Sequence, residues 1–217
     1  MPTPLALFDL DGTLVDRQMA YGDAIAALCR AHGFDEATER WLRLELADRA
    51  NLANFAELCA VFQLAVPAQQ LWQEYTGFVA AAVTCRPEAV QGLAQLRTAG
   101  WTIGIITNGA SDIQRRKITE SGLADLVDGI AVSGDLEIRK PDERLFELAA
   151  ARCGHDLAEG GWIIGDNPIT DIDGGRRAGL RTIWLRGRPW PTGLATADHT
   201  VDTAAEAIPI LLNETSE

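Results

Sequence analysis

Four aspartates in two short stretches could carry chemistry together. Asp9 and Asp11 follow an apolar run in LALFDLDGTLVD, and Asp166 and Asp171 follow another in GDNPITD. Carboxylates that converge on a small volume repel one another, and some must take up protons unless a cation lies among them. A hard divalent ion with oxygen ligands relieves this repulsion, and Mg²⁺ suits a site that also binds phosphate. The pattern therefore predicts a magnesium site formed by these four residues.

The first pair of acids could also react with a phosphate ester. A carboxylate can attack phosphorus and form an aspartyl-phosphate, and Asp9 at the end of the apolar run suits that role. Asp11 can donate a proton to the leaving oxygen and later take one from water. Gly12 allows a backbone path that a side chain would obstruct. We expect Gly12 and Thr13 to be among the residues that contact substrate.

Other residues offer binding groups for the phosphate. Thr107 has a hydroxyl, and the amides of Asn108 and Gly109 lie near an expected helix start, which is a common anion site. Lys140 brings positive charge for the phosphoryl group and for the crowded acids. The candidate catalytic residues are Asp9, Asp11, Thr107 and Lys140, and the candidate substrate-binding residues are Gly12, Thr13, Thr107, Asn108, Gly109 and Lys140.

Five apolar runs rich in Leu, Ile and Val must position these side chains. The runs are continuous rather than alternating, as in strands covered on both faces, and helical patterns separate most of them. Alternation of strand and helix predicts a parallel sheet with right-handed crossovers, where ligands bind at the carboxyl ends of the strands. The predicted strands are Leu5–Leu10, Trp101–Thr107, Gly129–Gly134, Gly161–Asp166 and Arg181–Arg186.

A block of about four helices is predicted between the first and second strands. Residues 21–83 hold no convincing strand, and their apolar side chains recur at helical spacing, as at Phe55, Leu58 and Phe62. The predicted fold is therefore α/β, a three-layer Rossmann-like parallel sheet with an inserted helical cap subdomain. Its core would comprise residues 1–15 and 86–217, and its cap residues 16–85.

Proline positions predict two helix starts close to candidate site residues. Pro141 and Pro168 each suit the first position of a helix, since the amide proton that proline lacks has no helical partner there. Asn167, directly before Pro168, is a good N-cap residue.

Composition and charge narrow the functional class. The chain has 217 residues, a formal net charge of −12 and a sequence pI of about 4.7, so nonspecific nucleic-acid binding is not expected. No signal peptide or membrane-spanning run is evident, and the four cysteines are scattered without a C-x-x-C pair. We expect a cytoplasmic monomer or homodimer that acts on a small phosphorylated metabolite and contacts neither nucleic acid nor membrane.

The motifs DLDGT, TN, KP and GDNPITD, in this order, resemble those of the haloacid dehalogenase superfamily. The resemblance covers nearly the whole chain and implies a phosphatase with a helical cap of the first type. It implies that Asp9 is the nucleophile, Asp11 the acid/base, Thr107 the hydroxyl residue and Lys140 the lysine. It also implies that Asp9, the backbone carbonyl of Asp11 and Asp166 hold Mg²⁺, with Asp171 as a ligand or a neighbour of the ligands.

The leading hypothesis is a Mg²⁺-dependent phosphatase that hydrolyses a small phosphate monoester. Three alternatives stay open: a phosphomutase of the β-phosphoglucomutase kind, a 2-haloacid dehalogenase, and a non-catalytic protein that binds a phosphorylated ligand. A dehalogenase needs no acid at Asp11, because a halide leaves without a proton, and a retired enzyme would be expected to have lost Asp9, Asp11 or Lys140. The substrate itself is not readable from the motifs.

Overall fold

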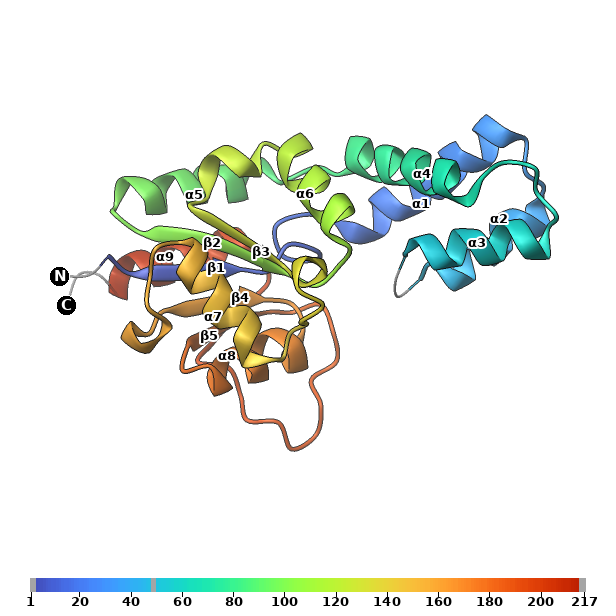
Figure 1. Ribbon diagram of the computed structural model, residues 1–217. Coiled ribbons are helices and arrows are strands. Elements are labelled where there is room, and N and C mark those ends of the chain that lie inside the picture. Colours follow the sequence, from blue (N-terminus) through green and yellow to red (C-terminus); the bar gives the residue numbers. More distant parts are fainter. Residues whose placement is uncertain (1–2, 48–49, 215–217) are drawn as a thin grey trace. The chain divides into compact units, whose positions relative to one another are not determined.

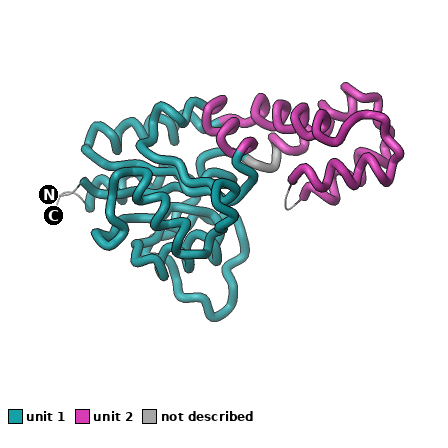
Figure 2. Tube along the Cα trace, viewed as in Figure 1, with its two compact units in different colours: residues 1–16, 85–111, 122–217 teal, residues 17–84, 112–121 magenta. Residues whose placement is uncertain are grey.

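The computed structural model describes residues 3–47 and 50–214. The chain forms two compact units, which Figure 2 distinguishes by colour. We call them the sheet unit, Met1–Asp16, Cys85–Ser111 and Gly122–Glu217, and the helical unit, Arg17–Thr84 and Asp112–Ser121.

A parallel sheet forms the centre of the sheet unit. Its strands are ordered β3-β2-β1-β4-β5-β6, which confirms the predicted α/β fold (Figure 1). The bounds are β1 Leu5–Phe8, β2 Thr102–Thr107, β3 Gly129–Val132, β4 Trp162–Gly165, β5 Arg181–Leu185 and β6 His199–Val201. The strand β6 was not predicted. It has only three residues and no apolar run, and its place in the sheet comes from pairing with β5.

Helices pack on both faces of this sheet. On one face, α5 lies against β2 and against α9; on the other, α7 lies against β1, β2 and β3, and α8 against β5 (Figure 1). The helices of the unit are α5 Pro87–Thr98, α7 Glu143–Arg152, α8 Gly174–Arg177 and α9 Ala204–Glu214. Its short helical turns are Leu123–Leu126, Ser133–Asp135, Leu157–Glu159 and Pro168–Asp173.

The apolar runs read from the sequence are buried between these layers. Every residue of β1 is buried, because alternate side chains of a central strand meet helices on opposite faces. Side chains of one face pack with α7 in a single cluster, which includes Leu5, Leu7, Ile106, Ala131, Phe146 and Ile163. This rigid packing holds the ends of neighbouring strands in register.

The helical unit contains the predicted block of helices and one further element. Its helices are α1 Arg17–His32, α2 Glu36–Glu45, α3 Leu52–Val61 and α4 Ala68–Ala82, and most of α6 Ser111–Glu120 belongs to it as well. Buried Phe55, Trp72 and Tyr75 form an aromatic cluster in this unit. The indole of Trp72 donates to Asp112 at 2.8 Å, and Lys117 donates to the Tyr21 hydroxyl at 2.9 Å. These contacts explain why residues 112–121 group with the helices rather than with the sheet.

One of the two predicted helix starts is confirmed. The Asn167 side chain accepts hydrogen bonds from the amides of Ile169 and Thr170, and Pro168 is the first residue of the following helical turn. The start predicted at Pro141 is wrong. Helix α7 begins at Glu143, with Asp142 as its N-cap.

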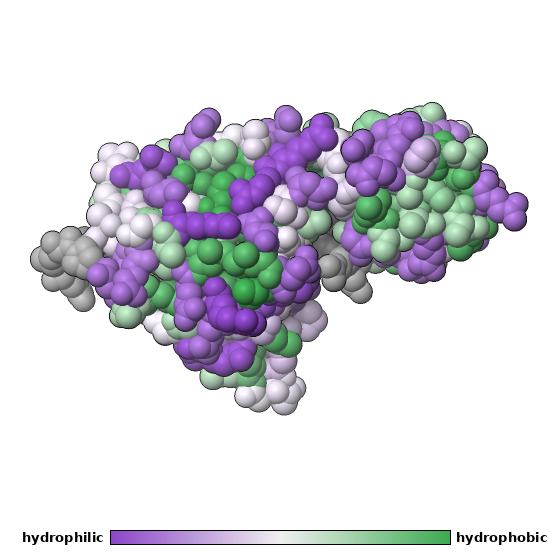
Figure 3. Space-filling view, viewed as in Figure 1, coloured by the Kyte–Doolittle hydropathy of each residue, from purple (hydrophilic) through white to green (hydrophobic). Residues whose placement is uncertain are grey.

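The face of the molecule drawn in Figure 3 is mixed in hydropathy. Purple hydrophilic surface alternates with green hydrophobic surface in Figure 3, and the large apolar side chains that are exposed are Leu44, Leu52, Val61, Leu136 and Ile169. All four cysteines are free thiols. Among the described residues, no helix combines the length and hydrophobicity needed to span a bilayer.

Replacing Gly175 by alanine tests how α8 packs on β4. An ideal Cβ at this position would lie 2.2 Å from Cγ2 of Ile163, so the added methyl group overfills the contact. We expect Gly175→Ala to lower the free energy of unfolding by about 1–3 kcal/mol. In an Ile163→Ala background the methyl group has room, so the same change should have a much smaller effect. Urea unfolding of the wild type, both single variants and the double variant measures this coupling; additive losses would contradict the proposed contact.

Candidate active site

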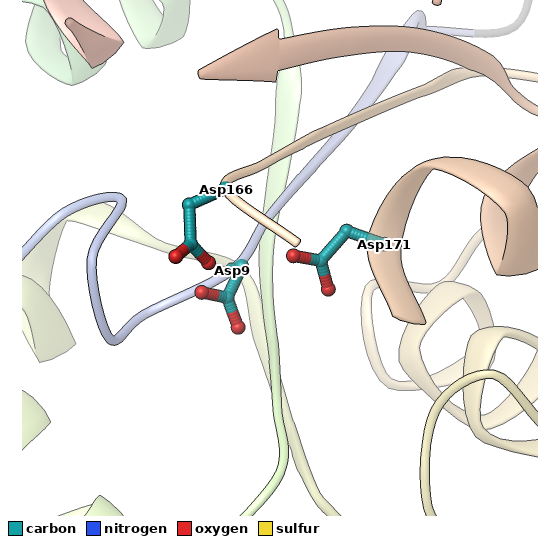
Figure 4. A group of neighbouring side chains, drawn as sticks. All are labelled: Asp9, Asp166 and Asp171. Carbon is teal, nitrogen blue, oxygen red and sulfur yellow. The ribbon is translucent and has the colours of Figure 1, made fainter. Parts of the chain in front are cut away.

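Three carboxylates meet where two neighbouring strands end. Asp9 follows β1, Asp166 follows β4, and Asp171 lies in the helical turn Pro168–Asp173, which comes after Asp166 in the chain (Figure 4). The strands β1 and β4 pair directly, and the amide of Asp9 donates to the Ile164 carbonyl at 2.9 Å. Each residue of the trio offers a carboxylate oxygen, and these oxygens lie within 4.8 Å of one another. We call Asp9, Asp166 and Asp171 the carboxylate group; all three are buried.

Glycines make room for the carboxylate group. Gly12 has a φ of +89°, and a Cβ on it would lie 2.9 Å from Oδ2 of Asp166. A Cβ on Gly165 would lie 2.5 Å from Cβ and Oδ2 of Asp171. Both contacts are too short for any side chain, so the acids approach the backbone as closely as they do only because these positions are glycine.

Lys140 is the buried cation of the site. Its Nζ lies 2.7 Å from Oδ1 of Asp9 and 2.7 Å from Oδ1 of Asp171, and it donates to the Ile106 carbonyl at 2.8 Å. An ammonium group has three donors, so each of them has an acceptor here. The Lys140 side chain is 1% exposed, which makes it a fixed part of the protein interior.

Asn108 fixes the backbone of Lys140. Its side-chain amide donates to the Lys140 carbonyl at 3.0 Å, and its side-chain oxygen accepts from the Lys140 amide at 2.9 Å. The neighbouring Gly109 is held as well, because its amide donates to Oγ of Ser133 at 3.0 Å and its carbonyl accepts from Gly134. The structure thus shows both predicted substrate-binding residues as parts of the frame around Lys140. Contact of their backbone amides with a phosphate stays a prediction.

The remaining predicted residues lie at the same edge of the sheet. Thr107 is the buried last residue of β2, and the Thr13 hydroxyl donates to Oδ2 of Asp9 at 3.4 Å. Asp11 is half-buried and forms an isolated backbone bridge with Val15. Its carboxylate is not part of the carboxylate group. The role of its backbone carbonyl as a metal ligand, which the family resemblance implies, stays a prediction.

Burial sets the protonation of the site. Desolvation raises the pKa of Asp9 to about 7; Lys140 opposes this rise, and the charges of Asp171 and Asp166 add to it. Desolvation alone would lower the pKa of Lys140, but its ion pairs with Asp171 and Asp9 outweigh burial and raise that pKa. Burial also raises the pKa of Asp166, against the hydrogen bond from Arg188. Lys140 therefore stays charged, while burial and neighbouring negative charge oppose ionisation of Asp9 and Asp166.

These residues fit a hard divalent cation. The donors are oxygen atoms that converge from two strand ends, and the pKa of Asp9 is raised by burial first and by the charges of Asp171 and Asp166 after it, which Lys140 only partly offsets. Mg²⁺ prefers such carboxylate oxygens, and it binds through a few of them together with water and phosphate oxygens. The carboxylate group would hold the ion.

The sequence interpretation missed Arg188. Its Nε donates to Oδ2 of Asp166 at 2.9 Å, so a second cation contacts the carboxylate group. Arg188 lies in the loop after β5. Ligands bind at the carboxyl ends of parallel strands, and this rule applies to β5 as it does to the four strand ends considered in the sequence. Ser133, which holds Gly109, was also assigned no role.

The sequence is similar to those of known hydrolases. A family described as haloacid dehalogenase-like hydrolase matches residues 3–179. A phosphoserine phosphatase of Thermus thermophilus is 40% identical over 46% of this chain and 39% of its own length. A pyrimidine 5'-nucleotidase of Escherichia coli is 33% identical over 61% of this chain and 60% of its own length. The chain thus spans less than two thirds of the length of either relative.

A solved structure matches over the whole length. The 2-haloacid dehalogenase of Pseudomonas syringae has a TM-score of 0.73 and 28% identity, and the match covers 98% of this chain and 100% of that one. Similar proteins therefore include enzymes named for phosphate esters and an enzyme named for haloacids.

The raised pKa of Asp9 predicts how stability depends on pH without metal. The carboxyl holds its proton up to a pH of about 7 in the folded protein and to about 4 in an unfolded chain. This stabilising contribution is present at low pH and is lost as the pH rises through that window. Relative to Asp9→Asn, the wild type should lose up to about 1.4 kcal/mol per pH unit. Urea unfolding in chelator, from about pH 5 to about pH 8, measures the difference.

Asp202→Asn is the matched control. Asp202 is 63% exposed and pairs with Arg186 away from the carboxylate group. Its stability difference from the wild type should stay nearly constant over the same pH range. A constant difference for Asp9→Asn as well would show that Asp9 titrates normally.

Proposed function

This chain belongs to the haloacid dehalogenase-like hydrolases, and we propose that it is a Mg²⁺-dependent phosphatase of a small phosphate monoester. The observation that carries the proposal is the contact of Asp9 with buried Lys140 beside two further acids. The lysine fixes the carboxylate that would attack phosphorus, and the neighbouring acids would hold the ion. The named phosphatase and nucleotidase relatives support the same class of substrate.

The chain's own residues divide the reaction among them. One oxygen of Asp9 is held by Lys140, and the other, which accepts a weak bond from Thr13, is the one we assign to attack. Asp11 would protonate the leaving alcohol and then take a proton from the water that cleaves the aspartyl-phosphate. The Thr107 hydroxyl would bind a phosphoryl oxygen. Mg²⁺, held by the carboxylate group, would neutralise charge on the phosphate.

The helical unit would serve as the cap. A cap excludes bulk water from the reaction and contacts the leaving group, so substrate choice would depend on its residues. We propose a small phosphorylated metabolite as substrate. The four free cysteines agree with a reducing compartment such as the cytoplasm.

Dehalogenation is the second candidate, because a full-length structural relative is a 2-haloacid dehalogenase. Displacement of halide by Asp9 would need neither a proton donor at Asp11 nor an ion among buried acids. Three buried carboxylates around one lysine would only oppose binding of an anionic haloacid. This electrostatic argument favours the phosphatase.

Asp9→Asn should lower turnover of p-nitrophenyl phosphate with Mg²⁺ by at least about a thousandfold. The amide cannot form the covalent intermediate, although it has nearly the same shape as the carboxylate. Release of nitrophenolate measures the rate, and excess chelator should abolish it in the wild type. Asp202→Asn, at an exposed position, should keep the wild-type rate. Undiminished turnover by Asp9→Asn would refute the assigned nucleophile.

Product analysis separates the alternatives. With a hexose 1-phosphate, we expect inorganic phosphate and free sugar, since water accepts the phosphoryl group; a mutase would instead yield an isomeric sugar phosphate. With 2-chloropropionate, we expect no release of chloride. Chloride release lost in Asp9→Asn would assign the chain to the dehalogenases, and no reaction with a broad panel of phosphate esters would favour a binding protein.

A further inference from the structure

Arg188 and Lys140 contact the same carboxylate group in different ways. Lys140 is 1% exposed and pairs with Asp9 and Asp171. Arg188 pairs with Asp166 through Nε, and its side chain is 46% exposed. One cation is thus a buried, fixed part of the site, while the other reaches it from solvent.

The guanidinium of Arg188 has donors to spare. Of its five N–H groups, only the one on Nε has a partner among the residues that the structure describes. The terminal nitrogens can therefore bind an oxyanion, and a guanidinium binds phosphate best through two parallel donors. The pKa of Arg188 is raised by its hydrogen bond to Asp166 and, more weakly, by the charges of Asp171 and Asp9. Its charge is thus felt where phosphorus would be attacked.

The loop that carries Arg188 is anchored beside the site. The Trp184 indole donates to the Asp166 carbonyl at 3.0 Å, and the rings of Trp184 and Trp190 meet edge to face with centroids 4.7 Å apart. Pro189 restricts the backbone next to Arg188. With the backbone held in this way, the long side chain is the part of the loop that can change partners.

We propose that Arg188 exchanges partners, binding Asp166 in the metal-free site and the phosphoryl oxygens of substrate once Mg²⁺ is bound. The inference rests on the proposed function. An ion held by the carboxylate group would draw on the same negative charge of Asp166, so its ion pair with Arg188 would weaken. The released guanidinium would then be available to a phosphate dianion that needs positive charge.

With this exchange, Arg188 weakens the binding of Mg²⁺ and strengthens the binding of phosphate. An ion pair as exposed as this one contributes little, so its loss should tighten Mg²⁺ binding by about threefold to fivefold. A charge-assisted contact to phosphate is stronger, so its loss should weaken phosphate binding by about tenfold or more.

Arg188→Gln tests both effects in the full-length protein. Calorimetric titration with Mg²⁺, and then with inorganic phosphate at saturating Mg²⁺, gives the two dissociation constants. We expect the first to fall and the second to rise, whereas general damage to the site would raise both. Arg188→Lys keeps the charge and should recover part of the phosphate affinity. Arg186→Gln removes a charge from the same loop, where Arg186 pairs with Asp202, and should change neither constant.

The outcomes separate this inference from the proposed function. If the wild type binds Mg²⁺ and hydrolyses phosphate esters, but Arg188→Gln changes neither constant or raises both, the exchange is wrong and the phosphatase stands. Tighter Mg²⁺ binding with unchanged phosphate binding also overturns the exchange, since Arg188 then only competes with the metal. If the wild type neither binds Mg²⁺ nor hydrolyses any ester, the proposed function fails and the inference fails with it.

Discussion

An excess of buried negative charge is the constraint on which this site depends. Asp9, Asp166 and Asp171 bring oxygens within 4.8 Å of one another, and Lys140 is the buried cation among them. Burying charge that is not fully paired is unfavourable, so the surrounding fold must hold the acids together against their repulsion. In the proposed phosphatase this excess would be useful, because a hard divalent cation would complete the charge balance and prepare the site for a phosphate dianion.

The fold enforces this arrangement through backbone features. Parallel pairing of β1 with β4 fixes where Asp9 and Asp166 leave the sheet. Gly12 and Gly165 then let the acids approach main chain that any side chain would displace. Asn108 holds the backbone of the residue that balances them. Because such contacts are made by strands and main chain, the buried cluster is more rigid than side-chain packing alone would make it.

The sequence predicted the sheet and four converging acids because both leave local signals, and the structure brings together the carboxylates of three of them, without that of Asp11. Continuous apolar runs mark central strands, and the rule that ligands bind at strand ends brings Asp9 and Asp166 together. The rest depends on contacts that residue types do not encode. Asn108 bonds to the main chain 32 positions away, and any residue there except proline offers the same two groups. Arg188 reaches Asp166 only through the closure of a loop, and α6 joins the helical unit through contacts such as Trp72 with Asp112.

The hydrogen bonds of Lys140 indicate that Lys140 and Arg188 have different roles in the proposed reaction. Its three donors already have acceptors on Asp9, Asp171 and the Ile106 carbonyl, so it cannot bind a phosphoryl oxygen without breaking one of these bonds. Breaking any of them would leave a buried acceptor unpaired, which is costly. In the proposed reaction, Lys140 would therefore act on substrate through its charge and by orienting Asp9. Direct contact with phosphate would then fall to groups with donors to spare, and the half-exposed guanidinium of Arg188 is one of them.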